Sequence, residues 1–176
     1  MKKGLILLFV MMATLTANAQ FYVGGTVGVN SAKPDGGDAV TTFSIMPEIG
    51  YNFSDNFAVG ATLGYAKAAN DYMNDLCKTF TIAPYARYTF LKTDLLNLFV
   101  DGEVSYSNIK EDVDGAESVS AFGIHVKPGL AVNVSDNISL IAKYGLLGYD
   151  KIKDYGSNFG FNINASKIEF GFIYNF

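Results

Sequence analysis

Large apolar residues alternate with small or polar residues along most of this chain. The pattern is clearest over residues 167–176, where one parity is wholly apolar and the other is mainly polar or small. Because alternate residues of a strand point to opposite faces, the pattern predicts a strand whose apolar face ends at the terminal aromatic residue. The apolar parity consists of Ile168, Phe170, Phe172, Tyr174 and Phe176.

Two kinds of strand-like segment alternate along the chain, and each occurs four times at spacings of 36 to 44 residues. The first kind starts on a polar residue and covers residues 20–29, 56–65, 97–106 and 137–146. The second kind ends on an apolar residue and covers residues 43–53, 80–90, 123–134 and 166–176. This period also occurs in solenoids and propellers, but four repeats of two long strands favour closure. We therefore expect an all-β fold, an eight-stranded antiparallel up-and-down barrel of four hairpin repeats.

The two faces of the predicted strands differ in a consistent way. One parity collects Val, Ile, Leu, Phe and Tyr, whereas the other collects Gly, Ser, Thr and charged residues. A barrel of eight strands has an interior only wide enough for side chains, and transmembrane barrels are apolar outside and polar within. The sequence thus predicts a transmembrane barrel with its small and charged residues inside. The alternative, a soluble lipocalin-like ligand-binding barrel, needs the opposite polarity.

The connections between the predicted strands alternate in length. Short ones cover residues 54–56, 92–97 and 135–137, and long polar ones cover 31–40, 66–78, 108–118 and 148–165. Short periplasmic turns and long extracellular loops are typical of outer-membrane barrels. With its hairpin repeats and terminal Phe176, the chain resembles the OmpA/OmpX-like small barrels, the porin-family proteins with an outer membrane protein beta-barrel domain. The resemblance implies a place in the bacterial outer membrane among lipid and lipopolysaccharide, and recognition of the terminal strand by the outer-membrane assembly machinery.

The N-terminal residues predict export. Lys2 and Lys3 precede an apolar run over residues 5–16, and Ala17-Asn18-Ala19 provides an A-x-A cleavage site. This arrangement is typical of a secretory signal peptide, and the run is too short for a membrane-spanning helix, which leaves a retained anchor as the weaker alternative. We expect a signal peptide over residues 1–19 and one barrel domain over residues 20–176.

Composition excludes several other functions. Without Lys2 and Lys3, 11 basic and 17 acidic residues remain, a net charge of −6, and no basic cluster stands out. An acidic chain of this kind is not expected to bind nucleic acid. The single cysteine, Cys77, rules out an intrachain disulfide, and no metal-binding, phosphate-loop or dinucleotide motif indicates a cofactor.

Charged residues on the small-residue parity form a candidate lumen network. We expect four acidic, four basic and one histidine side chain to point inward: Glu48, Arg87, Asp101, Glu103, His125, Lys127, Lys143, Lys167 and Glu169. Unpaired charge is costly in a narrow barrel, so a paired network that plugs the lumen is the prediction, with an ion pathway or proton relay as the alternative. Alignment of the repeats places Arg87 opposite Asp101, and we expect Arg87 to bridge both Asp101 and Glu103.

An enzymatic role is the runner-up, since some small outer-membrane barrels modify lipid. Such chemistry needs a nucleophile activated by a base. His125 is the only histidine, and no serine lies within two residues of it. The sequence therefore predicts a non-enzymatic barrel whose extracellular loops serve envelope support or contact an unknown extracellular partner.

The loops and three prolines leave open questions. Acidic residues over 112–117 provide oxygen atoms of the kind that Ca²⁺ prefers, although the full ligand set is missing. The aromatic residues between 149 and 161 either anchor a partner or sit at the lipid headgroups. Pro47, Pro84 and Pro128 occupy equivalent outward positions. Because proline removes a ladder donor, these positions suggest a ring of bulges.

Overall fold

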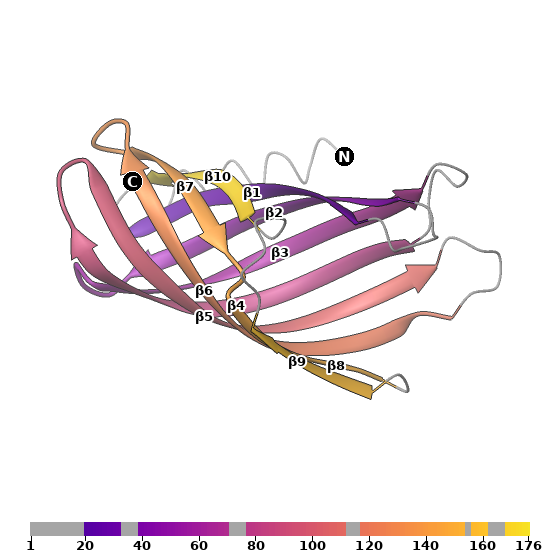
Figure 1. Ribbon diagram of the computed structural model, residues 1–176. Helices are drawn as coiled ribbons and strands as arrows, with labels where there is room; N and C mark the ends of the chain where they lie inside the picture. The colour runs from indigo at the N-terminus through magenta and orange to yellow at the C-terminus, as the bar shows by residue number, and fades with distance from the viewer. Residues whose placement is uncertain (1–19, 33–38, 71–76, 112–116, 154–155, 162–167) are drawn as a thin grey trace, which may run out of the picture.

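The computed structural model describes residues 20–32, 39–70, 77–111, 117–153, 156–161 and 168–176, and these form one barrel of antiparallel strands (Figure 1). The predicted signal peptide, residues 1–19, lies outside the described ranges, as do residues 112–116 of the expected acidic loop. The strands are β1 (Phe21–Ala32), β2 (Val40–Asn52), β3 (Phe57–Asn70), β4 (Cys77–Lys92), β5 (Leu96–Glu111), β6 (Val119–Asn133), β7 (Ile138–Tyr144), β8 (Leu147–Ile152), β9 (Gly156–Phe161) and β10 (Ile168–Asn175).

The predicted eight-stranded closed barrel is confirmed. Strands β1 to β6 pair in sequence, β6 pairs with β7, β7 with β10, and β10 with β1 to close the cylinder. The seventh position is shared, because β7 and β8 lie one after the other along β6 with Gly145 and Leu146 between them. Strand β9 pairs with β8, and this hairpin extends toward the loop end of the barrel (Figure 1).

Several predicted loops are shorter than expected. The connection expected over residues 148–165 contains most of β8 and all of β9, and the ladders of β3, β4 and β5 also continue into the expected loops. Polar and glycine-rich composition concealed these strands. Above the membrane a strand no longer needs an apolar face, so the alternation that reveals a strand disappears while the ladder continues.

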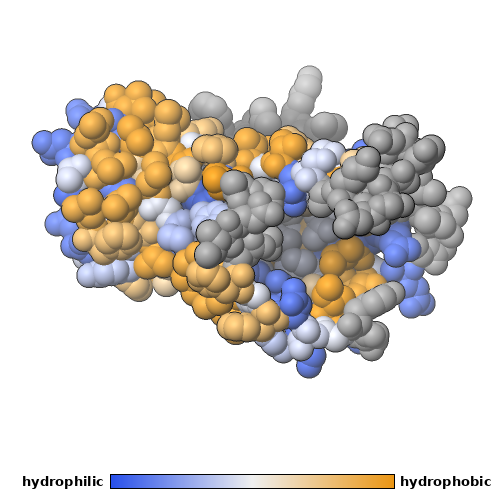
Figure 2. Space-filling model, viewed as in Figure 1, coloured by the Kyte–Doolittle hydropathy of each residue, from blue (hydrophilic) through white to orange (hydrophobic). Residues whose placement is uncertain are grey.

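The wall has the polarity of a membrane protein. Val27, Leu63 and Phe172 are typical of the outward parity, and each is about half exposed. In Figure 2 apolar residues gather on the outer wall, and hydrophilic residues lie at the two ends. The outward placement of these large apolar side chains contradicts a soluble lipocalin-like barrel. Among the described residues there is no helix long and apolar enough to cross a membrane.

Aromatic residues gather at the end of the barrel that carries the short turns. The rings of Phe21 and Tyr51, and those of Tyr51 and Phe53, pack edge to face with centroids 4.9 Å and 5.0 Å apart. Tyr174 and Phe176 pack in the same way at 5.1 Å. This arrangement is typical of the aromatic girdle of outer-membrane barrels. It fixes the turn end at one membrane interface and the loop end at the other.

Two of the predicted tight turns are each stabilised by a serine at the equivalent position. The backbone N–H of Phe57 donates to Ser54 Oγ at 3.1 Å, and that of Ile138 donates to Ser135 Oγ at 3.2 Å. The asparagine that follows each of these turns ties the two strands of its repeat together, because Asn56 Nδ2 donates to the carbonyl of a β4 residue and Asn137 Nδ2 to that of a β10 residue, both at 2.7 Å. The polar start of the repeat is therefore a structural device at the turn end.

The expected ring of bulges at the prolines is wrong in two of three places. The ladder between β2 and β3 is interrupted at Pro47, and that between β4 and β5 at Pro84, but the register is the same on both sides of each interruption. The missing proline N–H thus interrupts the hydrogen-bond ladder, but neither strand contains the extra residue that a bulge requires. Only at Pro128 does the register shift, where Gly145 and Leu146 separate β7 from β8.

Candidate functional site

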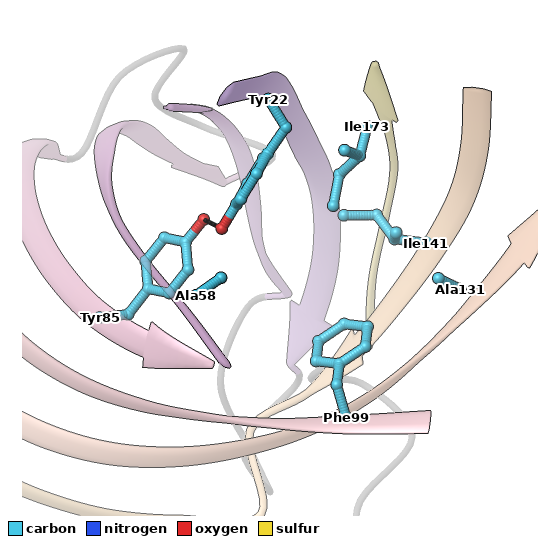
Figure 3. Close-up of a cluster of buried hydrophobic side chains, with 7 residues drawn as sticks. All are labelled: Tyr22, Ala58, Tyr85, Phe99, Ala131, Ile141 and Ile173. Carbon is cyan, nitrogen blue, oxygen red and sulfur yellow. Dashed lines mark hydrogen bonds between the residues drawn. The ribbon is translucent and has the colours of Figure 1, made fainter. Parts of the chain in front are cut away.

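An aromatic layer crosses the lumen near the turn end. Tyr22 on β1 and Tyr85 on β4 reach toward each other, and their hydroxyl groups share a hydrogen bond of 2.7 Å (Figure 3). Register explains how two large rings fit. Tyr22 pairs with Gly50, Gly50 with Gly60, and Gly60 with Tyr85, so the rings lie over two glycines of the intervening strands. A Cβ added to Gly60 would lie 2.6 Å from Tyr85 Oη.

Beside this layer, Arg87 forms the centre of a buried ion-pair cluster. Its Nε and Nη2 donate to the two carboxylate oxygens of Asp101 at 2.7 Å and 2.9 Å. Lys143 Nζ lies 2.6 Å from Glu48 Oε2 and 3.4 Å from Asp101 Oδ2. The guanidinium carbon also lies 4.1 Å from the centroid of the Phe99 ring. Two cations and two carboxylates thus balance one another, with the four residues exposed by only 2–7%.

A second charged cluster lies toward the loop end. Lys127 Nζ contacts the Glu103 carboxylate at 2.9 Å and Glu169 at 3.9 Å. His125 Nε2 lies 3.0 Å from Asp150 Oδ1, and its Nδ1 lies 3.6 Å from Glu103 Oε1. Measured on side chains alone, Glu103 is 9% exposed, about the same as Arg87 at 8%, whereas Lys127, His125 and Asp150 are 14%, 22% and 49% exposed. This cluster links β5, β6, β8 and β10 without sealing the space between them.

Cavities lie on both sides of the buried cluster. The one at the turn end has a volume of about 570 Å³ and is floored by Tyr22, Arg87 and Phe99. One at the loop end has a volume of about 330 Å³, and His125, Lys127 and Glu169 are among its lining residues. These two cavities share no lining residue, and Glu48, Asp101, Lys143 and Tyr85 line neither. The cluster is therefore the partition between them.

The predicted network is largely in place. The structure pairs Arg87 with Asp101 in direct register across β4 and β5 and joins them by two hydrogen bonds, which confirms that contact. Glu103 is not the second carboxylate of Arg87. That position belongs to Glu48, 3.7 Å away, because Glu103 lies one inward step nearer the loops and pairs with Lys127. Lys167 lies outside the described residues.

Sequence reasoning missed the inward aromatic residues and Asp150. Tyr22 shares its parity with glycines. Its alignment opposite Gly50 on the adjacent strand could have indicated that the ring points into the lumen. Asp150 was hidden in an expected loop. In the part of the chain that the structure describes, no group of three or more His, Cys, Asp and Glu side chains could hold a metal ion. The two nitrogens of His125 face carboxylates, not a hydroxyl group.

The terminal strand has its predicted apolar face. On β10, Phe170 and Phe172 are more than half exposed on the outer wall, and the strand pairs with both β1 and β7. The backbone N–H of Phe176 donates to the carbonyl of Phe21 at 3.1 Å. The last residue of the chain thus helps to join the two ends of the barrel wall.

Comparison with known proteins agrees with this architecture. Neisserial surface protein A is similar in structure, with a TM-score of 0.61 and 19% identity over 89% of this chain and 97% of that one. The N-terminal β-barrel domain of Pseudomonas aeruginosa OprF is similar too, with a TM-score of 0.60 and 15% identity over 89% and 98% of the two chains. At these identities the likeness concerns the fold alone.

No curated protein sequence matches the chain. The family model described as outer membrane protein beta-barrel domain matches residues 4–176, nearly the whole sequence. The apolar outer wall and the closed eight-stranded barrel agree with that match. The chain belongs to the outer membrane protein beta-barrel family and is a protein of the bacterial outer membrane.

Proposed function

We propose that this barrel is a non-conducting, non-enzymatic scaffold of the outer membrane, which holds its extracellular loops for envelope support or for contact with an extracellular partner. The observation that carries the proposal is the partition formed by Arg87, Asp101, Glu48 and Lys143 between the two lumen cavities. A paired, desolvated cluster in a lumen of eight strands leaves little room for ions to pass.

Three features support the plug over an ion pathway. The charges of the cluster balance, so no net field draws one sign of ion through it. The hydroxyl pair of Tyr22 and Tyr85 fills the lumen beside the cluster. Arg87 is held by two carboxylates and an aromatic face at once, so its displacement breaks several contacts together.

Planar-bilayer recording of the purified protein tests the plug. We expect no stable conductance of porin size from the wild-type barrel. The variant Tyr22→Ala/Arg87→Ala, which removes two large side chains of the partition, is expected to conduct measurably if it stays folded. Lys92→Ala, at the rim of the turn-end cavity, is the matched control and stays silent. Reproducible porin-sized channels in the wild type would overturn the proposal.

The non-enzymatic part of the proposal rests on His125. Its Nε2 hydrogen-bonds Asp150 at 3.0 Å, and its Nδ1 lies 3.6 Å from Glu103 and has no hydrogen-bond partner, so neither nitrogen contacts a hydroxyl group that it could activate. Incubation of the purified protein with radiolabelled outer-membrane lipid, followed by thin-layer chromatography, is expected to show no acyl transfer or deacylation. A product that disappears in a His125→Asn variant would establish the enzyme instead.

We also propose that the apolar face of β10, from Ile168 to Phe176, is the segment recognised by the assembly machinery. Its support is the row of exposed aromatic side chains formed by Phe170, Phe172 and Tyr174 on the outer wall. Phe176→Ala is expected to slow insertion in a pulse-chase assay while the finished barrel unfolds at nearly the wild-type denaturant concentration. Unchanged insertion kinetics would remove this role.

A further inference from the structure

Three lysines form a row across adjacent strands at the loop end. Lys67 on β3 pairs in direct register with Lys78 on β4, and Lys78 pairs in direct register with Lys110 on β5. Side chains directly opposite each other on neighbouring strands have Cβ atoms about 4.5–5.5 Å apart. Three positive charges are therefore held side by side by the backbone ladder itself.

The row lies on the outer surface of the barrel. Thr79 and Ile109, which flank Lys78 and Lys110 in sequence, line a cavity on the lumen side. Because alternate residues of a strand face opposite sides, Lys78 and Lys110 point outward. Lys67 has the parity of Leu63 on β3, which is exposed on the outer wall, so it points outward too.

The row also lies just beyond the membrane-spanning part of the wall. The outward apolar residues extend from Phe57 to Tyr65 on β3, nine residues, and from Phe80 to Phe90 on β4, eleven residues. A tilted strand crosses the hydrocarbon core in about 9–11 residues. Lys67 and Lys78 are the next outward residues on the loop side. Their ammonium groups are thus at headgroup depth, above exposed aromatic rings.

Like charges directly opposite each other on a sheet are destabilising. A row of three lysines therefore favours the approach of an anion. Lys67 and Lys78 also take part in other interactions within the protein, so an incoming anion would share these cations with them. The long-loop side of an outer-membrane barrel faces the exterior, and the anions at this depth are lipid phosphates.

We propose that Lys67, Lys78 and Lys110 form a docking site for the phosphorylated headgroup of a glycolipid of the outer leaflet, with the acyl chains against Tyr65 and Phe80. A phosphate group accepts hydrogen bonds from several ammonium groups at once. The site depends on the outer-membrane location of the barrel and not on the plugged lumen, so either proposal can fail without the other.

Native mass spectrometry of the refolded full-length barrel in detergent tests the site, with bisphosphorylated lipid A as the probe. We expect discrete lipid adducts that weaken as salt increases, and much weaker adducts with the same lipid after removal of its phosphates. Each lysine near a charged membrane surface corresponds to a factor of about five in affinity. The variant Lys67→Gln/Lys78→Gln/Lys110→Gln is expected to bind about a hundredfold more weakly.

Strand β4 offers a matched control, because Lys78 lies near its loop end and Lys92 at its turn end. Lys78→Gln is expected to weaken binding about fivefold, and Lys92→Gln to leave it unchanged. Heat-dependent gel mobility shows that each variant is folded. If the triple variant fails to fold, the comparison of Lys78→Gln with Lys92→Gln still tests the site. Equal binding by Lys78→Gln and Lys92→Gln, or equal binding of phosphorylated and dephosphorylated lipid, would overturn the site.

Discussion

The two halves of the lumen contain the same kinds of side chain in different surroundings. Toward the turns, Arg87 and Asp101 are exposed by only 7% and 2%, and aromatic rings cover them. Toward the loops, Lys127 and Glu103 form an ion pair of 2.9 Å whose side chains are 14% and 9% exposed, and the neighbouring His125 and Glu169 are 22% and 20% exposed. Arg87 and Lys127 each line a cavity, so the two halves differ in the exposed fractions of their side chains and in the aromatic rings around Arg87.

That difference decides what each cluster does for the protein. A buried pair that loses one partner leaves a desolvated charge, which costs several kcal/mol. A pair whose surroundings are partly exposed can exchange part of the lost contact for water, so less is lost. We therefore expect the turn-side half to determine stability and closure, and the loop-side half to tolerate change.

The sharpest test is Arg87→Ala, which should lower the free energy of unfolding by about 3–5 kcal/mol. The loss leaves Asp101 and Glu48 with Lys143 as their one remaining cation in the cluster. Adding Asp101→Ala should recover part of the loss, because it removes one uncompensated carboxylate. A double-mutant cycle read by urea unfolding in detergent measures the coupling. Strictly additive losses would mean that the contact contributes no coupling energy.

The aromatic layer gives a somewhat smaller effect. Gly60→Ala should destabilise the barrel by about 1–3 kcal/mol, as overpacking does. The new Cβ would meet both the Tyr85 hydroxyl and the backbone carbonyl of Ile49 at 2.6 Å, and the carbonyl cannot move aside. Gly102→Ala is the control, since a Cβ there has no atom within 4 Å. Equal unfolding midpoints for the two variants would show that the ring does not fill that space.

Much of this architecture follows from the sequence because a membrane barrel obeys one strict rule. Because lipid lies on one side of the wall and a narrow lumen on the other, large apolar residues alternate with small or polar residues along every strand. The eight strands and the inward-facing charged residues can therefore be predicted from this alternation. The pairing of Arg87 with Asp101 follows from the alignment of the repeats, although the ladder between β4 and β5 shifts its register between Thr89 and Leu91, nearer the turn.

Contacts across the lumen do not follow from hairpin register. Lys143 pairs in register with Glu169 on β10, yet its ion pairs are with Glu48 on β2 and Asp101 on β5, neither of which is a neighbouring strand. Strand tilt and the shear of the barrel determine which side chains meet across the interior, and neither appears in the alternation. Strands β8 and β9 were missed for a related reason, since outside the membrane no apolar face is required.

The loop-side cluster should respond less than either turn-side test. Lys127→Ala is expected to cost about 1.5 kcal/mol, the low end for a hydrogen bond to a charged group. Glu103 would keep His125 within 3.6 Å and gain access to the adjacent cavity. Urea unfolding beside Arg87→Ala provides the comparison. A loss as large as that of Arg87→Ala would mean that the two halves do not differ in this way.

The smallest effect is expected for Asp150→Asn, below about 0.5 kcal/mol in global unfolding, because pairs with an exposed member contribute little. Asp150 is half exposed, yet its contact with His125 ties β8 to β6 at the place where the seventh strand is split. Local opening can change where global stability does not. We therefore expect faster amide hydrogen exchange in β8 and β9, with exchange in β3 and β4 unchanged. Faster exchange throughout the barrel, or none in β8, would mean that this contact does not hold the loop-side hairpin separately from the rest of the wall.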